Sequence, residues 1–365
     1  MAEPIIVFDK LNKWYGNNFH VLRDIDPNRA LGERIVSCGP SDSGRIWAQL
    51  RLWLIATLLV MPPAWAFDLQ SHRGARGLMP ENTLAAFEHA LRLGVTTLEL
   101  DIAITADGIP VVSHDPALNP AITRDASGQW LKGKGPLIRS LTLAQLQAYD
   151  VGRADPSSDY GRTLLSQQAQ DGQRIPTLAS VFALVRRLGA NTVRFDMETK
   201  IFPNRPDDTL DVSAFVDTVL QAIRTAGMSN RVMIQSFDWR SLRLIQQREP
   251  TIETVYLTME YARSNNVRDS AWTAGMLWRD HASTAHMVKA SGGTTWSPNF
   301  NHIDAPAVKR AQQLGLKVIP WTVNEPADMD RLISWGVDGI ISDYPDRLRD
   351  AMRRAGLPLP PPIAQ

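Results

Sequence analysis

The hydrophobic pattern changes character at Phe67, and from there it alternates between two kinds of segment. Short runs rich in β-branched and other apolar residues predict strands, and longer stretches with apolar positions at helical spacing predict helices. The predicted strands are Phe67–Ser71, Thr96–Ile102, Thr192–Met197, Val232–Ser236, Thr254–Thr258, Thr294–Ser297, Lys317–Thr322 and Gly339–Ser342. The predicted helices include Leu84–Leu91, Leu178–Leu188, Val212–Ala226, Ala305–Leu314 and Ala327–Trp335.

This order of elements predicts an α/β fold, namely a (β/α)8 TIM barrel, over residues 67–355. A doubly wound sheet is the alternative, but no G-x-G-x-x-G follows the first predicted strand. The stretch from about Pro116 to Ile175 is rich in Gly, Ser, Asp and Gln, and it predicts a small insertion after the second strand unit. Long segments of this kind often cover a functional face. Residues 356–365 form a Pro-rich tail.

The segment before the predicted barrel, residues 48–66, has the order of a secretory signal. Arg51 precedes an apolar run from Leu52 to Val60, and Ala64-Trp65-Ala66 provides a small-residue cleavage site after Ala66. The alternative is a buried core helix, which the Pro62-Pro63 pair disfavours. We therefore expect a periplasmic or secreted protein without a stable membrane anchor, or a cytoplasmic one if the signal is not used.

Residues 1–47 are an unusual extension upstream of that signal. Their sequence resembles a truncated N-terminus of an ABC-transporter ATPase, with a G-x-x-x-x-G at Gly39–Gly44. Arg45 and Ile46 stand where a P-loop needs Lys and Ser/Thr, so the phosphate-binding and magnesium-binding groups are both missing. We interpret this part as a degenerate remnant or as an upstream start assigned by mistake. A nucleotide-dependent transporter subunit is a further hypothesis, which rests on residues 1–45 alone.

Composition limits the classes of partner. The 365 residues are 44% apolar and carry a net charge of +1, which predicts neither a nucleic-acid groove nor a polybasic membrane surface. The single cysteine, Cys38, excludes an intrachain disulfide and lies far from the predicted barrel.

Polar residues stand where the predicted strands end, which is where a barrel places its functional side chains. Carboxylates at Glu99, Asp101 and Glu198 suit a hard divalent cation, either Ca²⁺ or Mg²⁺. Two histidines, two cationic residues and one tryptophan occupy comparable positions: His72, His114, Arg73, Lys200 and Trp321. A cation, two histidines and two positive charges together predict phosphodiester cleavage with histidine acid–base catalysis.

Each of these features also has a purely structural interpretation. An E-x-D pattern on a strand occurs by chance, His114-Asp115 can form a turn, and Glu198 and Lys200 can form a surface ion pair worth little. The functional interpretation depends on several strand ends in succession presenting polar groups.

Three sequence blocks resemble the signature blocks of the glycerophosphodiester phosphodiesterase family: HRGARGLMPENTLAAFEHAL, LELDIAITADGIPVVSHD and FDMETK. The resemblance runs from about Gln70 to Leu348 and includes VMIQSFDW, VIPWTVNEP and GVDGIISDYPD. It implies a TIM barrel with a small insertion and one divalent cation held by carboxylates. The roles it implies are metal binding for Glu99, Asp101 and Glu198, catalysis for His72 and His114, and substrate binding for Arg73, Lys200 and Trp321.

The expected reaction is hydrolysis of a small glycerophosphodiester, such as glycerophosphocholine or glycerophosphoethanolamine, to glycerol 3-phosphate and an alcohol. Two alternatives remain open. One is phospholipase-type cleavage of larger lipid diesters, which needs an apolar rim, whereas the predicted insertion is polar. The other is a non-catalytic phosphodiester-binding protein. The oligomeric state is not predicted.

Overall fold

The computed structural model describes residues 11–15, 19–25 and 67–363, and the chain divides into two units at residues 64 and 65. In the first unit, β1 (Leu11–Tyr15) pairs antiparallel with β2 (Phe19–Ile25). The predicted signal segment and the degenerate P-loop lie outside the described residues. No helix in the described part of the chain has the length and apolar character needed to cross a bilayer.

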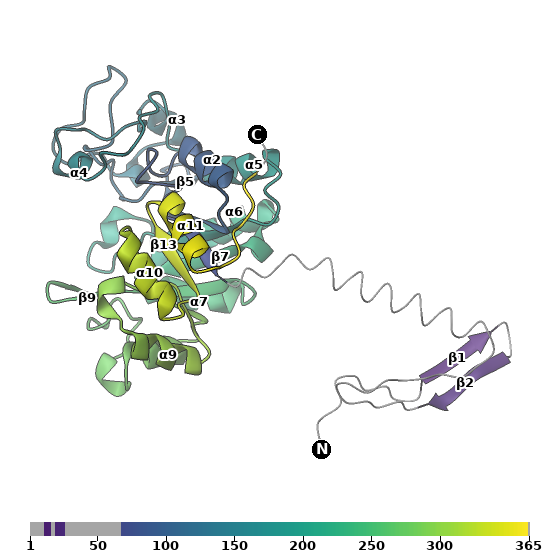
Figure 1. Cartoon of the computed structure of the whole chain (residues 1–365). Helices are drawn as coiled ribbons and strands as arrows, with labels where there is room; N and C mark the ends of the chain where they lie inside the picture. Colours follow the sequence, from purple (N-terminus) through teal and green to yellow (C-terminus); the bar gives the residue numbers. More distant parts are fainter. Residues whose placement is uncertain (1–10, 16–18, 26–66, 364–365) are drawn as a thin grey trace. The chain divides into compact units, whose positions relative to one another are not determined.

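The second unit is the predicted (β/α)8 barrel (Figure 1). Within residues 67–363 its parallel strands are β3 (Asp68–Ser71), β4 (Thr97–Ile104), β6 (Arg194–Thr199), β7 (Val232–Ser236), β8 (Glu253–Thr258), β11 (Thr295–Pro298), β12 (Lys317–Val318) and β13 (Gly339–Ser342). The sheet order is β12-β11-β8-β7-β6-β4-β3-β13, so each strand lies beside its neighbour in the chain. Backbone hydrogen bonds from Asp338 N to Val318 O (2.9 Å) and from Ile341 N to Pro320 O (3.0 Å) close the ring.

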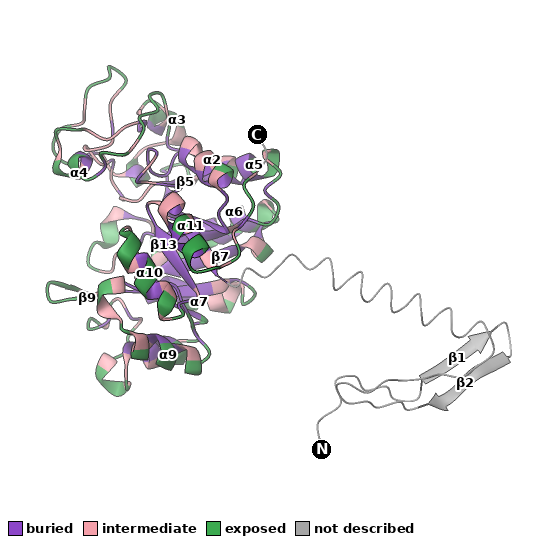
Figure 2. Cartoon of the chain, viewed as in Figure 1, coloured by how far each residue is buried: buried purple, intermediate pink, exposed green. Residues whose placement is uncertain are grey.

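Each barrel strand leads to a helix on the outside. These helices are α2 (Leu84–Leu93), α5 (Leu178–Arg187), α6 (Val212–Thr225), α7 (Trp239–Arg248), α8 (Thr284–Ala290), α9 (Ala305–Gln313), α10 (Pro326–Ser334) and α11 (Pro345–Arg354). Several begin at a side-chain cap: the Thr83 hydroxyl accepts from Ala86 N, and Asp211 and Asp304 cap α6 and α9 in the same way. Their apolar faces pack on the buried sheet, and their outer faces are exposed (Figure 2).

Several predicted strands differ from the structure at an end, and two of the differences have a clear structural cause. The second continues to Ile104, because β4 extends beyond the barrel and pairs antiparallel with β5 (Pro110–Val112). The predicted strand Lys317–Thr322 is regular only at Lys317 and Val318. Pro320 has no N–H to donate to a ladder, and the chain beyond it keeps only single hydrogen bonds, such as Trp321 N to Pro298 O (3.1 Å).

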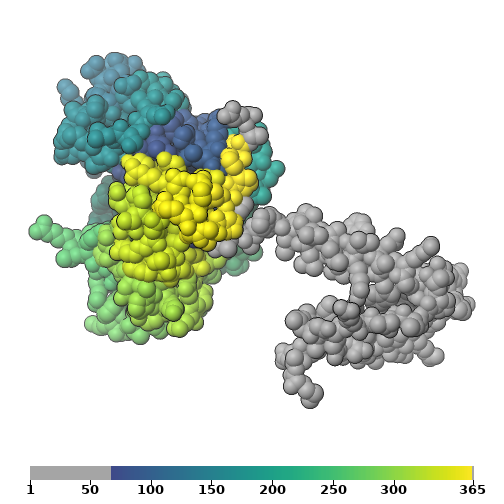
Figure 3. Space-filling view, viewed as in Figure 1, coloured from purple at the N-terminus to yellow at the C-terminus, as the bar shows by residue number. Residues whose placement is uncertain are grey.

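The insertion lies between β5 and α5, after the second strand unit as predicted. It contains the 3₁₀ turn η1 (Ile138–Ser140) and two short helices, α3 (Leu143–Leu146) and α4 (Asp159–Arg162). It has a small apolar core of its own, which includes Leu118, Ile138, Leu146, Val151 and Ile175. The teal atoms of this segment gather as a lobe beside the first strand unit (Figure 3).

The remaining loops carry short elements: the 3₁₀ turns η2 (Pro206–Asp208), η3 (Ser229–Arg231), η4 (Trp278–Asp280) and η5 (Phe300–His302), and the hairpin of β9 (Glu260–Tyr261) with β10 (Ser264–Asn265). The Pro-rich tail follows α11 and lies against the barrel. The Arg349 guanidinium donates to Pro360 O (2.8 Å), and Ile363 N donates to Leu91 O (3.2 Å).

Candidate active site

Three carboxylates predicted to bind metal meet inside the barrel at the carboxyl ends of β4 and β6. In the parallel register of these strands Asp101 lies opposite Glu198, and Glu99 projects to the same face two residues earlier. The three side chains are buried, and one oxygen from each lies within 4.8 Å of the others. Like charges this close in a barrel interior repel one another, so the arrangement requires compensation.

Part of that compensation comes from the protein. Asp101 Oδ2 accepts from Asn82 Nδ2 (3.0 Å), and the Lys200 ammonium lies 2.8 Å from Glu198 Oε1. The pKa of Asp101 is held below its usual range: burial opposes ionisation, but the neighbouring His114, Lys200 and Arg73 favour it. Burial and the charge of Asp101 raise the pKa of Glu99 well above its usual range.

The remaining imbalance fits a divalent cation. Asp101 Oδ1 is fully buried and accepts no hydrogen bond; its nearest cation is the Lys200 ammonium, 3.6 Å away. Burial raises the pKa of Glu198 to about 7, even with Lys200 beside it. One of the three carboxylates thus has an oxygen without a hydrogen bond, and the other two have raised pKa values. A hard divalent cation would bind these oxygens and favour the ionised form of all three.

Arg73 lies directly beside the carboxylates. Its backbone adopts φ +50°, and its N–H donates to Glu99 Oε2 (2.8 Å). Its Nε lies 3.4 Å from Asp101 Oδ2, and its Nη1 donates to Glu81 Oε1 (2.9 Å). Because a left-handed backbone is strained in an arginine, the bond to Glu99 helps to hold this conformation.

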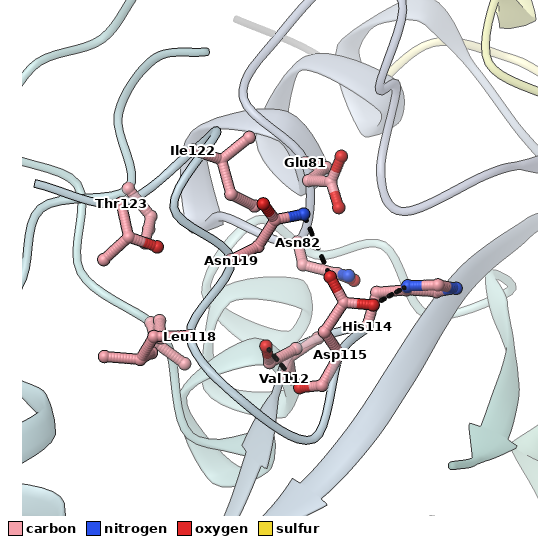
Figure 4. A pocket seen from close by; sticks show the side chains of 12 residues that line it. Glu81, Asn82, Val112, His114, Asp115, Leu118, Asn119, Ile122 and Thr123 are labelled. Carbon is pink, nitrogen blue, oxygen red and sulfur yellow. Dashed lines mark hydrogen bonds and ion pairs between the residues drawn. The ribbon is translucent and has the colours of Figure 1, made fainter. Parts of the chain in front are cut away.

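Each predicted histidine is held by a carboxylate through Nδ1. His72 Nδ1 lies 2.6 Å from Asp343 Oδ1, and His72 Nε2 lies 4.0 Å from Glu99 Oε2. Burial lowers the pKa of His72, although Asp343 opposes that shift. His114 Nδ1 lies 2.9 Å from Asp115 Oδ1, while Asp115 also accepts from Asn119 (Figure 4). Burial and the charges of Arg73 and Lys200 lower the pKa of His114 to about 4.

A carboxylate at Nδ1 accepts the proton of that nitrogen, so Nε2 is the atom left for chemistry in both rings. A lowered pKa favours the neutral imidazole, which is the form that a general base requires, whereas a general acid must first be protonated.

Trp321 follows β12 and contacts residues of the fourth and sixth barrel strand units. Its indole N–H donates to Ser297 O (2.9 Å), and its ring packs edge-on against Phe237 at 5.3 Å between centroids. The second contact places Trp321 beside an aromatic side chain of the loop after β7.

Several residues that the sequence analysis did not assign to the site support it. Gln235 donates to Glu99 Oε1 (2.7 Å), and Asn324 and Arg76 donate to Asp343 (2.8 and 3.0 Å). Glu81 lies beside Arg73, and Tyr160 of the insertion donates to it. Asp343 and Gln235 stand at strand ends, which is a usable signal, whereas Arg76 and Tyr160 carry no signal in the local sequence.

Comparisons with known proteins assign the barrel to a family. Residues 72–347 match the model of the glycerophosphoryl diester phosphodiesterase family. A glycerophosphodiester phosphodiesterase of Bacillus subtilis is 30% identical over 76% of this chain and 83% of its own length. One from Caldanaerobacter subterraneus is 28% identical over 78% and 98%.

Solved structures give the same result. A protein of Silicibacter pomeroyi that carries the same family name superposes with a TM-score of 0.72, at 35% identity, over 80% of this chain and 95% of that one. A phosphodiesterase of Oleispira antarctica, solved with the product sn-glycerol-3-phosphate, shares the fold at 23% identity, with a TM-score of 0.58 over 78% of this chain and 96% of that one. The chain therefore belongs to the glycerophosphoryl diester phosphodiesterase family, and it is a glycerophosphodiester phosphodiesterase with a (β/α)8 barrel.

Proposed function

We propose that this enzyme hydrolyses small glycerophosphodiesters, such as glycerophosphocholine and glycerophosphoethanolamine, to glycerol 3-phosphate and an alcohol in a metal-dependent reaction. The observation that carries the proposal is the buried group of Glu99, Asp101 and Glu198, with Arg73 and Lys200 in direct contact with it. The names of the relatives and the product bound in the Oleispira antarctica structure support the same substrate class.

Glu99, Asp101 and Glu198 would hold one divalent cation, Mg²⁺ or Ca²⁺. When bound, such a cation polarises a phosphoryl oxygen and offsets negative charge in the transition state. Arg73 and Lys200 carry positive charge at the same place, so they bind the phosphodiester anion and stabilise the charge that develops on it.

His72 and His114 are the proposed acid–base pair. Each presents Nε2, because a carboxylate occupies Nδ1. One imidazole, in its neutral form, removes a proton from the nucleophile, which is water or the glycerol 2-hydroxyl, and the other, in its protonated form, gives a proton to the leaving alcohol. Attack by the 2-hydroxyl gives a cyclic phosphate, which water then opens. Trp321 and Phe237 would line the mouth of the barrel, where the alcohol leaves.

The test of these roles is the release of glycerol 3-phosphate from glycerophosphocholine by the full chain and by His72→Ala and His114→Ala. We expect each substitution to lower kcat by about 10²–10⁴-fold. His286→Ala is the matched control, since this histidine contacts Ser283 at the start of α8. Near-normal turnover in both His72→Ala and His114→Ala would contradict the acid–base proposal.

A second candidate function is the cleavage of lysophospholipids. It needs an apolar surface that contacts the acyl chain, and aromatic side chains of the loops after the strands could supply one. Phe237 packs against Trp321, Phe202 packs against Trp272 at 6.0 Å between ring centroids, and all four side chains are partly exposed. A human relative, 25% identical, is named a lysophospholipase D. Parallel assays with glycerophosphocholine and lysophosphatidylcholine distinguish the two candidates. Faster turnover of the lysolipid would favour the second, and binding of either without turnover would indicate a non-catalytic protein.

We also propose that residues 48–66 direct export and are removed after Ala66. N-terminal sequencing of the protein isolated from its native cell tests this proposal. A mature chain that begins at Phe67 supports it, and a chain that retains residues 48–66 contradicts it.

A further inference from the structure

The insertion reaches the active site through one side chain, Tyr160. This residue lies on α4, and its hydroxyl touches three charged residues of the loop between β3 and α2. It donates to Glu81 Oε2, accepts from Arg76 Nε (2.8 Å), and lies 3.4 Å from Arg73 Nη1. The Arg76 guanidinium also lies 5.0 Å from the centre of the Tyr160 ring.

Two chains of contacts lead from this hydroxyl to the proposed catalytic groups. Through Glu81 it reaches Arg73, which lies beside Asp101. Through Arg76 it reaches Asp343, which holds His72. Arg73 and His72 are therefore both held, each through one neighbour, by Tyr160, a residue of the insertion and not of the barrel.

The local sequence is built to place Tyr160 there. The Ser158 hydroxyl caps α4 by accepting from Gly161 N (2.9 Å). A Cβ at Gly161 would lie 1.9 Å from Asp155 O, so only glycine fits behind the tyrosine. The segment after α4 is hydrogen-bonded to the loop between β3 and α2. Gln167 Nε2 donates to Arg76 O (2.9 Å), and Gln168 N donates to Leu78 O (2.8 Å).

The charges explain why a hydroxyl is needed. Glu81 is shared by two guanidinium groups, at 2.9 Å from Arg73 Nη1 and 3.3 Å from Arg76 Nε. The Tyr160 hydroxyl donates to the Glu81 carboxylate and accepts from the Arg76 guanidinium, so it gives each group a hydrogen bond without adding a charge. Burial and Glu81 raise the pKa of Tyr160, so the phenol keeps its proton.

We propose that Tyr160 is a positioning residue, through which the insertion fixes both Arg73 and His72 for phosphodiester cleavage. This rests on the roles proposed above for those two residues. Tyr160 does not touch the three carboxylates of the triad; it acts on the substrate through its neighbours.

The test compares Tyr160→Phe with Tyr149→Phe in the full chain, with glycerophosphocholine as substrate. Tyr149 is the matched control, because it is a half-buried tyrosine of the same insertion that packs against the insertion core. For Tyr160→Phe we expect kcat to fall about 10–100-fold, the range seen when a residue that orients a functional group is lost. Product inhibition by glycerol 3-phosphate should weaken about threefold or more, because Arg73 is less well held. Tyr149→Phe should change neither quantity by more than about twofold.

Thermal unfolding separates positioning from folding. Tyr160→Phe removes the hydroxyl that bonds to Glu81 and Arg76, so we expect Tm to fall by about 4–10 °C while the variant stays folded at the assay temperature. A normal kcat in Tyr160→Phe, or a fall in kcat that only follows a fall in folded protein, would overturn the proposal. If the wild-type chain releases no glycerol 3-phosphate, the proposed function fails; if it does and the two variants behave alike, only the role of Tyr160 fails.

Discussion

His72 and Asp343 come from opposite ends of the barrel sequence, and their side chains meet at 2.6 Å. His72 follows β3, the first strand, and Asp343 follows β13, the last, and these two strands pair in parallel. Closure of the barrel is therefore what brings the carboxylate to the imidazole. Arg76 and Asn324 also donate to Asp343, so the carboxylate itself is held in place.

Replacement of this carboxylate should impair catalysis more than folding. In Asp343→Asn the amide can donate to Nδ1 and so favour the tautomer with the proton on Nε2. We expect kcat to fall by about 10²–10⁴-fold with glycerophosphocholine, as for other histidines that lose an orienting aspartate. Asp350→Asn on the exposed face of α11 is the control, and equal activity of the two variants would contradict the role of Asp343.

Replacement of Arg73 by lysine should impair binding of the phosphodiester. The guanidinium contacts Asp101 through Nε and Glu81 through Nη1, and a single ammonium cannot make both contacts. We expect kcat/KM of Arg73→Lys to fall by about tenfold or more, with an increase in KM for the phosphodiester. Arg92→Lys on α2 changes an exposed pair with Glu88 and should leave both constants unchanged. Steady-state kinetics at saturating metal measure the difference.

Divalent metal should stabilise the folded chain, because it relieves repulsion among three buried carboxylates. At a metal concentration of a hundred times Kd, the gain is about 2.7 kcal/mol. In a chain of this size that corresponds to a Tm increase of about 5–10 °C. Differential scanning calorimetry with Mg²⁺, Ca²⁺ and chelator measures the change. The double variant Glu99→Gln/Asp101→Asn should lose it, and an identical increase in that variant would indicate metal binding elsewhere.

Gly74 is expected to be irreplaceable in the loop that carries Arg73. Its φ is +89°, and a Cβ there would lie 2.7 Å from the Ala86 Cβ on α2. Gly74→Ala should lower the free energy of unfolding by about 1–3 kcal/mol through strain and crowding. Gly108→Ala shares the positive φ but meets open space, so its cost should be only about 1 kcal/mol. Urea unfolding compares the two, and equal costs would show that crowding at Gly74 is unimportant.

Much of the barrel could be predicted from the sequence because each strand unit repeats the same local pattern. The apolar run of Val232–Ser236 and the helical spacing of Val212–Ala226 match β7 and α6 closely. The end of β12 could not be predicted in this way, because Pro320 interrupts the ladder while tertiary hydrogen bonds keep the chain extended. The polar sequence of the insertion likewise gave little sign of its separate apolar core.

The site was predictable where a residue stands at a strand end, since the barrel gathers those positions. Glu99, Asp101 and Glu198 meet for this reason. Tyr160 could not be predicted, because it lies 84 residues from Arg76 in the chain and reaches it only through the path of the insertion. Such contacts depend on tertiary structure and leave no local pattern.

The most direct test of the proposed reaction is the release of glycerol 3-phosphate from glycerophosphocholine by the full chain. It is measured with Mg²⁺, with Ca²⁺ and with chelator, alongside the double variant Glu99→Ala/Asp101→Ala. We predict release with at least one metal, none with chelator, and none from the double variant. Release that persists in chelator, or in the folded double variant, would contradict catalysis at the buried carboxylates.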